Sequence, residues 1–433
     1  MLYNETNEKW HVKRYMTYLP HSGFHNQRIA FENALVLAYA LRRTLIIPPI
    51  RLGNKPIRYV EYDTLVMHHE LSTKDGLQHC LQVPSAVSSP LECLGYFTWT
   101  TVPWIWLVNL TMISNVQPLL HLPSSSQHWF RQQFNLTDDD IEVLRDETPY
   151  QFRFLDTDTD SSPPTDRYSQ DVHISDLATS NATLLQFGTL FGTSRLRLRD
   201  KVQLDYQRLI RENMAITNQD LTKVVRFIAL QLQDDFVSVH LRAGDGHFKH
   251  EVSATVNNVW RKLLRDVMHF SDVTICDFAR EVTGTDVLHC STGQQRFGNC
   301  TAPLTTPKSL ASKRSIDTLQ CRSTLHQNTA YTGFNMPLYV ATDLRDPEIH
   351  PDLELFRITF PCIFFLNDFL PALQPLKALR SPYDGVDLYP FLLPLVDGMV
   401  ASEALRFVGT EGSTFSKFVM NLWKNDHEIP GSH

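Results

Sequence analysis

Three short stretches of this 433-residue chain combine glycines with basic or hydroxyl side chains, a pattern that suits the binding of a phosphorylated ligand. The most informative is Val237-Ser-Val-His-Leu-Arg-Ala-Gly-Asp-Gly-His247. Side chains alternate along a strand, so His240 and Arg242 should emerge on one face, about 6.6 Å apart, just before a glycine turn. Arg242 can stabilise a phosphate there, although a structural ion pair with Asp245 is the alternative.

The other two stretches each place a glycine loop between a strand and a helix. One is Phe407-Val-Gly-Thr-Glu-Gly-Ser-Thr-Phe-Ser416, in which Ser413 or Thr414 can cap the helix that follows. Free backbone N–H groups at a helix start suit an anion, although capping without a ligand is an ordinary use. The other is Ser22-Gly-Phe-His-Asn-Gln-Arg28. Each stretch alone is weak evidence for a phosphate-binding site, but three such stretches in one chain are stronger evidence.

Hydrophobic spacing predicts the elements that position these stretches. Residues 15–19 are expected to form a strand, 28–43 a helix, and 44–47 a buried strand that ends at two prolines. Such units build parallel sheets covered by helices, with ligands at the carboxyl ends of the strands. The same order recurs late in the chain, with expected strands at 236–242, 338–342 and 405–408 and a helix at 415–422.

Composition excludes several classes of protein. The 40 Lys+Arg against 47 Asp+Glu give a net charge of −7, and no long basic run occurs, so neither a nucleic-acid binder nor a polybasic membrane module is indicated. No apolar stretch reaches the roughly 18 residues that a membrane span needs. The length and the 42% hydrophobic content predict two domains, 1–200 and 201–433.

Cysteines and sequons favour the lumen of the secretory pathway, in the endoplasmic reticulum or Golgi. Four of the seven cysteines (Cys276, Cys290, Cys300 and Cys321) lie in one polar stretch, and five Asn-x-Ser/Thr sequons occur. We expect an insertion at about 282–337 and at least one disulfide among these cysteines, because the paired spacing of a zinc site is missing. A cytosolic protein with buried single cysteines is the alternative. The first residues lack a signal-peptide pattern, so the lumenal hypothesis needs a missing N-terminal segment, which would also allow membrane anchoring.

Together, the three stretches resemble the GDP-fucose protein O-fucosyltransferase family, and its fungal-like members in particular. The matching motifs are Asn26-Gln27, His240-Leu-Arg242, and Asp397 followed by the segment 407–415. Their order and spacing match over nearly the whole chain. The resemblance implies an α/β, glycosyltransferase-B-like fold with two Rossmann-like lobes facing a cleft. The N-terminal lobe would lie on the acceptor side, and the C-terminal lobe would bind GDP-fucose.

The resemblance also implies two catalytic residues. Arg242 would contact the donor diphosphate and stabilise the leaving group, and Asn26 would reach the sugar and the acceptor. A forked guanidinium and helix N-terminal N–H groups can stabilise the departing diphosphate without a metal, so no metal and no cofactor are expected beyond GDP-fucose as donor substrate. The Asp-rich run at 156–160 is the one rival metal site, and its Ser/Pro-rich surroundings favour a solvated loop.

The donor-binding residues that the resemblance implies come from all three motifs. Some family members carry a Glu before the Gly-Phe of the first motif as base for the acceptor hydroxyl, but Ser22 stands here. The base is therefore unassigned, with His21, His25 and Glu32 as nearby candidates and Glu32 the more structural of them. Besides Arg242, the donor-binding residues would be His240 and Asp397 at the guanosine, Ser413, Thr414 and Phe415 at phosphate and nucleoside, and Gly23 and Phe24.

Two classes of function remain. The first is an inverting glycosyltransferase that moves fucose from GDP-fucose to a Ser/Thr hydroxyl of a glycoprotein or to a glycan. The second is a non-catalytic lumenal protein of the same fold that binds a nucleotide sugar or a glycoprotein. Ser22 and the long insertion favour the second, whereas the intact sets around Arg242 and Asp397 favour the first. An enzyme that uses another sugar nucleotide is a third, weaker hypothesis.

Overall fold

The chain divides into two compact units. Unit 1 contains residues 1–222 and 374–393, and unit 2 contains residues 223–373 and 394–433. The first division thus follows Thr222, where the sequence suggested a boundary near 200, and a late segment returns to unit 1. The structure is a computed structural model that describes residues 14–53, 56–84, 86–124, 126–157, 167–233, 235–244, 246–283 and 319–427.

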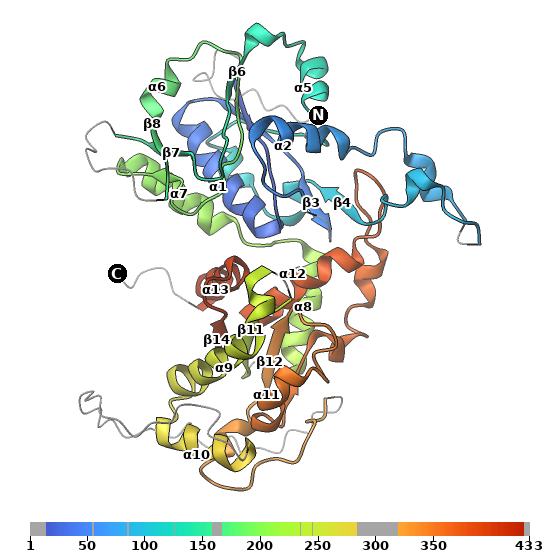
Figure 1. Cartoon of the computed structure of the whole chain (residues 1–433), viewed down its shortest axis with the longest axis vertical. Helices are drawn as coiled ribbons and strands as arrows, with labels where there is room; N and C mark the ends of the chain where they lie inside the picture. Colours follow the sequence, from blue (N-terminus) through green and yellow to red (C-terminus); the bar gives the residue numbers. More distant parts are fainter. Residues whose placement is uncertain are drawn as a thin grey trace. The chain divides into compact units, whose positions relative to one another are not determined.

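Unit 1 is built around a parallel sheet whose strand order over the described residues is β5-β2-β1-β9-β6. Figure 1 labels its edge strand β6 and the helix α1. Every strand pair in this sheet is parallel. The strands predicted at 15–19 and 44–47 are confirmed as its centre, β1 and β2. The bounds are β1 (Tyr15–Tyr18), β2 (Thr44–Ile47), β5 (Leu119–His121), β6 (Ile141–Leu144) and β9 (Leu184–Phe187).

Two smaller sheets complete unit 1. Strands β3 (Ile50–Gly53) and β4 (Trp99–Val102) pair antiparallel. A parallel sheet with the order β10-β7-β8 contains β7 (Phe152–Leu155), β8 (Gln170–His173) and β10 (Leu196–Arg197). The helices are α1 (Phe24–Ala40), α2 (Tyr62–Leu71), α3 (Trp104–Leu107), α4 (Thr111–Ser114), α5 (Gln127–Phe134), α6 (Ile174–Ala178), α7 (Lys201–Asn213) and α8 (Gln219–Gln231), which spans the division.

Helix α1 begins earlier than the helical spacing predicted. Its expected range was 28–43, but the helix starts at Phe24, with Gly23 as the residue before its first turn. It is buried on most of its surface and packs against β1, β2 and α7. Trp104 stacks on Phe31 with ring centroids 4.4 Å apart. Apolar residues outside the expected stripe therefore lie in the core, because the helix is covered on two sides.

Unit 2 contains a parallel sheet with the order β13-β12-β11-β14 over the described residues. The late strands are confirmed within one residue of their predicted ends. No helix in the described ranges is long and apolar enough to cross a membrane. The elements are β11 (Val237–Leu241), β12 (Leu338–Thr342), β13 (Ile363–Phe364), β14 (Arg406–Gly409), α9 (Val252–Lys262), α10 (Asp272–Thr283), α11 (Glu354–Thr359), α13 (Thr414–His427) and α12 (Tyr389–Ser402), which begins in unit 1.

Strand β11 is buried on both faces, as a central parallel strand should be. Val239 and its alternating apolar neighbours pack into a core cluster that includes Trp260 and Phe334. On the opposite face, the Ser238 hydroxyl donates to the carbonyl of Ala401 in α12 (2.6 Å). The predicted alternation is confirmed, and so is the α/β class of both units. The two lobes facing a cleft stay a prediction.

One disulfide within the described residues joins a cysteine of the predicted group to a cysteine outside it. Cys321 pairs with Cys362, outside the cysteine cluster, and Cys80 pairs with Cys93, a bond that the sequence analysis did not anticipate. Cys276 is also disulfide-bonded. Residues 284–318, which include Cys290, Cys300 and much of the expected insertion, lie outside the described residues.

The Cys321–Cys362 disulfide should stabilise unit 2 more than the Cys80–Cys93 disulfide stabilises unit 1. Their sequence separations are 41 and 13. Chain entropy then predicts losses of about 4 and about 3 kcal/mol on removal, because a longer closed loop restricts the unfolded chain more. Urea unfolding of the two Cys→Ser double variants, followed by hydrogen exchange in each unit, measures both. A larger loss from the shorter loop would contradict the entropic origin.

Candidate functional site

Six predicted site residues lie in unit 2, around the carboxyl ends of neighbouring parallel strands. Strand β11 pairs with β12 on one side and β14 on the other, and His240 is in register with Ala341 and Gly409. The carboxyl ends of these strands therefore meet at one edge of the sheet. In open α/β sheets this edge is where ligands bind.

His240 is a neutral, buried hydrogen-bonding group. Its Nδ1 lies 2.7 Å from the hydroxyl of Ser416 in α13, and its ring centroid lies 4.7 Å from that of Phe415. Burial lowers the pKa of His240 to about 3, and the positive charge of Arg242 acts in the same direction. The imidazole is therefore uncharged at neutral pH, and it fastens the start of α13 to the sheet.

Arg242 has a fixed backbone and a partly exposed side chain. Its N–H donates to the hydroxyl of Thr410 (3.0 Å), which itself donates to the carbonyl of His240 (2.9 Å). The side chain is 31% exposed, and Nη1 lies 3.2 Å from a carboxylate oxygen of Asp343. The alternative partner from the sequence, Asp245, lies outside the described residues. The guanidinium thus stands at the edge of the sheet, within reach of solvent.

Asp343 is a site residue that sequence reasoning missed. Its Oδ1 accepts the backbone N–H groups of Ala243 (2.7 Å) and Gly244 (2.8 Å), while its other oxygen faces Arg242. One carboxylate therefore holds both the loop after β11 and the guanidinium. Its position directly after the predicted strand 338–342 was the available signal, because that strand was expected to end at the same edge.

Asp397 is bound to the end of β12. Its Oδ1 accepts the Tyr339 hydroxyl (2.6 Å), and its Oδ2 accepts the N–H of Thr342 (3.0 Å). Burial raises the pKa of Asp397 to about 7, and the nearby charge of Asp343 adds to the rise. The two hydrogen bonds act against it, but less strongly. Near neutral pH the carboxyl group is therefore shared between its charged and neutral forms.

The loop before α13 depends on glycine. Gly412 has φ +76°, and a Cβ on Gly409 would lie 2.6 Å from the Cβ of Ser416. A larger residue would strain the turn or push α13 off the sheet. The buried Ser413 hydroxyl accepts the N–H of Ser416 (3.2 Å), so it caps the helix, whereas Thr414 is exposed. Capping, which the sequence left open, is what Ser413 does here.

Three predicted site residues lie in unit 1, at the start of α1. Gly23 is exposed and precedes the first turn, and the Phe24 ring lies 6.0 Å from that of Trp104. Asn26 is half-buried, and its side chain makes no hydrogen bond within the described part of the chain. The nine predicted residues thus form two groups, one in each unit.

The three candidate bases are poorly suited to accept a proton. The pKa of His21 is lowered to about 3, mainly by burial and to a smaller extent by the charges of His69 and Arg195. Its ring nitrogens lie 2.8 Å from the Ser22 hydroxyl and 2.6 Å from that of Thr189. His25 is buried, too.

Glu32 forms an ion pair with Arg28 (2.5 Å), the structural role that the sequence favoured. Part of the Asp-rich run at 156–160, the rival metal site, also has a structural role. Asp156 accepts the backbone N–H groups of Arg199 and Asp200, and the residues 158–160 lie outside the described ranges.

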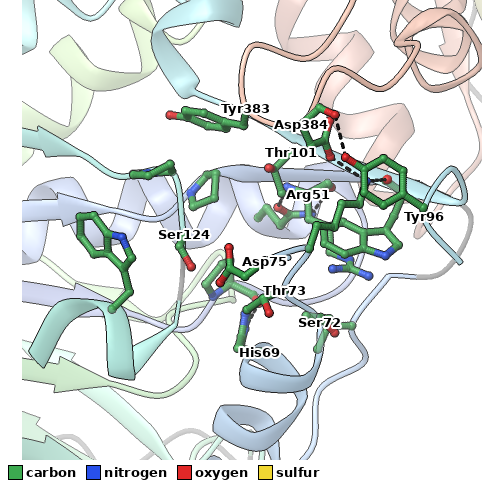
Figure 2. A pocket seen from close by; sticks show the side chains of 18 of the residues that line it. Arg51, His69, Ser72, Thr73, Asp75, Tyr96, Thr101, Ser124, Tyr383 and Asp384 are labelled. Atoms are coloured by element: carbon green, nitrogen blue, oxygen red, sulfur yellow. Dashed lines mark hydrogen bonds and ion pairs between the residues drawn. The ribbon is translucent and has the colours of Figure 1, made fainter. Parts of the chain in front are cut away.

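A cavity of about 190 Å³ opens beside the first motif in unit 1. His21, Ser22 and Gln27 line it together with Arg51 and other residues from β3, β4, the loop after α2 and the segment 374–393. Figure 2 shows Arg51, Tyr96 and Asp384 on one side of it and Ser124 on another. Sequence reasoning missed this pocket, since its charged residues lie in segments without a motif.

No protein-family model matches the chain. It is 58% identical over 38 residues to O-fucosyltransferase 30 of Arabidopsis thaliana, a match that spans 9% of this chain and 8% of that protein. The structure is similar to the crystal structure of POFUT1 in complex with GDP-fucose (14% identity, 96% of this chain and 97% of that chain, TM-score 0.38). It is also similar to POFUT1 in complex with GDP (13% identity, 96% of each chain, TM-score 0.39). The 38-residue match confirms the resemblance to O-fucosyltransferases.

Asp397 should make stability depend on pH in a defined direction. Its folded pKa lies above its unfolded value, so the stabilisation is complete below about pH 4 and is lost as pH rises to about 7. Asp397→Asn cannot ionise. The unfolding free energy of the wild type, relative to this variant, should therefore fall by on the order of 3 kcal/mol across that range. Urea unfolding at several pH values measures it, and a constant difference would contradict the buried carboxyl.

Proposed function

We propose that the protein is an inverting fucosyltransferase that moves fucose from GDP-fucose to a Ser/Thr hydroxyl of a protein or to a glycan. The observation that carries the proposal is the edge of the sheet in unit 2, where the partly exposed Arg242 follows β11 and its backbone is hydrogen-bonded to Thr410 in the loop before α13. A fixed guanidinium fork and the N–H groups of a helix start are donors suited to a diphosphate. The resemblance to O-fucosyltransferases is the reason for proposing GDP-fucose as the donor.

In this proposal the protein acts mainly on the leaving group. Cleavage of the bond between fucose and phosphate leaves negative charge on the diphosphate, and Arg242 stabilises that charge. Thr410 and Asp343 hold the arginine and its loop, so little reorganisation is needed. Phe415 lies beside His240 and offers a ring to the nucleoside, and Asp397 is the group for the guanine edge.

The acceptor hydroxyl would lose its proton without a strong protein base. His21, His25 and Glu32 are buried or paired, so cleavage of the fucosyl–phosphate bond would lead. As the acceptor oxygen bonds to the fucosyl carbon, GDP departs, and the proton of the hydroxyl passes to its diphosphate or to water. In the proposal, Asn26 positions the sugar or the acceptor. For the cellular site we propose the lumen of the endoplasmic reticulum or Golgi, because the Cys80–Cys93 and Cys321–Cys362 disulfides persist in an oxidising compartment.

Arg242 is the sharpest test of this proposal. Arg242→Lys keeps the charge but loses the fork, so turnover of GDP-fucose should fall by on the order of 10² to 10³-fold, and by more in Arg242→Ala. The melting temperature should change little, since the Arg242–Asp343 pair is partly exposed.

Arg345→Ala serves as the matched control. This arginine is exposed and lies two residues after Asp343, and the variant should keep wild-type turnover. If Arg242→Ala melts many degrees lower yet its folded fraction transfers fucose normally, the arginine is structural. If the wild type binds GDP but never transfers fucose, the chain is the binding protein that the sequence left as the alternative.

Transfer should not require a divalent metal. The charge on the diphosphate can be stabilised by Arg242 and the start of α13, so activity should be the same with and without EDTA. The measurement is initial rate in EDTA, with added manganese as the comparison. Loss of activity in EDTA and its return with manganese would assign the diphosphate charge to a metal instead.

A further inference from the structure

We propose that the pocket of unit 1 binds an acidic sugar of the acceptor glycan, with Arg51 holding the carboxylate of that sugar. The pocket adjoins His21, Ser22 and Gln27 of the first motif, on the side expected to receive the acceptor. The assignment of this sugar to the acceptor rests on the proposed transfer reaction. The binding site itself does not, because it follows from the residues that line the cavity.

Arg51 carries a charge that the described part of the protein does not neutralise. Its Nε is buried without a hydrogen-bond partner, and no described carboxylate lies within ion-pair distance of the guanidinium. The guanidinium carbon lies 3.8 Å from the centre of the Trp99 ring. Burial lowers the pKa of Arg51 to about 10, so it remains charged at neutral pH. A guanidinium without a carboxylate partner gains charge-assisted hydrogen bonds when an anion binds to the part of it that lines the pocket.

The backbone of Arg51 is fixed where a ligand would need it. The Gln27 side chain accepts the N–H of Arg51 (2.9 Å) and donates to its carbonyl (2.8 Å). Arg51 also lies opposite Thr101 in the β3–β4 pair, and both residues line the pocket. The arginine is therefore held by the first motif and by a strand pair rather than by a mobile loop.

The second cation of the pocket is already neutralised. Lys74 lies 2.6 Å from a carboxylate oxygen of Asp384 and donates to the carbonyl of Trp99 (2.6 Å). Burial lowers the pKa of His69 to about 4, so this lining histidine is neutral. Asp75 is exposed, lines the same cavity and pairs with nothing in the described ranges.

One unpaired arginine and one unpaired carboxylate select the chemistry of the ligand. A sugar acid offers a carboxylate to the fork of Arg51 and hydroxyl donors to Asp75. It also has an apolar ring face for the indoles of Trp99 and Trp129, which line the cavity. An inorganic phosphate would satisfy Arg51 alone and would be repelled by Asp75.

An acidic peptide is the competing class of ligand. Peptides commonly gain affinity by pairing with a free strand edge. The lining of this cavity comes instead from short segments that surround a small volume, and β3 and β4 already pair with each other. The geometry therefore favours a single sugar ring over an extended chain.

The test is an NMR titration of the full chain with methyl glucuronide and with methyl glucoside, its neutral counterpart. The wild type should bind the glucuronide, and the glucoside at least about tenfold more weakly. Arg51→Gln should weaken glucuronide binding by about tenfold to a hundredfold, in the range of one charge-assisted hydrogen-bond pair. Arg51→Lys, which keeps the charge without the fork, should lie between the two.

Arg58→Gln is the matched control, because Arg58 is an exposed arginine of the same segment outside the pocket lining. It should bind like the wild type. Melting temperatures show whether each variant is folded. If Arg51→Gln is unfolded, the affinity of Arg51→Lys for the glucuronide decides the test. Unchanged affinity in the folded Arg51 variants, equal binding of the glucoside, or tighter binding of a blocked acidic tripeptide would each overturn the assignment.

A titration with GDP on the same samples keeps this inference separate from the proposed reaction. Binding of GDP without binding of the glucuronide would overturn only the acidic-sugar site. Binding of the glucuronide without binding of GDP would leave that site in place and remove the proposed donor.

Discussion

The position of β11 between β12 and β14 is the constraint on which the rest of unit 2 depends. These parallel strands come from segments that begin at residues 237, 338 and 406, and only their pairing brings Arg242, Asp343 and Thr410 to one edge. The Thr410 hydroxyl links the β14 segment to the β11 segment, and the Asp343 carboxylate links the β12 segment to the β11 segment. A shift in register would separate all of these contacts at once, because side chains change face with every residue.

Burial then decides which of these polar groups carry charge. His240 and Asp397 lie inside, where desolvation lowers the pKa of the histidine and raises that of the aspartate. Both are used as hydrogen-bonding groups that fasten helices to the sheet. The ion pair of Arg242 and Asp343 stands farther out, where water reduces the cost of charge. At the base of this edge His240 is therefore uncharged and Asp397 only partly ionised near neutral pH, whereas an ion pair stands at its rim.

The sequence predicted the strands β1, β2, β11, β12 and β14, because short apolar runs between turn residues have few other structures available. It also predicted the shared edge that holds His240 and Arg242. It could not predict Asp343 or Thr410 as partners, since each contact joins residues more than 90 positions apart in the chain. The disulfide of Cys321 was missed for the same reason, because cysteine spacing does not determine pairing. Nor could it predict the unpaired Arg51, whose surroundings come from several segments of unit 1.

Each motif contains a residue that holds the structure and a close neighbour that faces outward. Gln27 fixes β3 through two hydrogen bonds, whereas Asn26 before it makes none with its side chain in the described chain. Ser413 is buried and caps α13, whereas Thr414 is exposed.

The third motif shows the same division. His240 lies in β11 and is buried, whereas Arg242 follows the end of β11 and is partly exposed. A glycine loop at the end of a strand makes this possible, since the backbone turns within a few residues from a buried direction to an exposed one. The buried member of each pair therefore fixes the direction of the exposed one. Substituting the buried member would therefore also change the orientation of the exposed one.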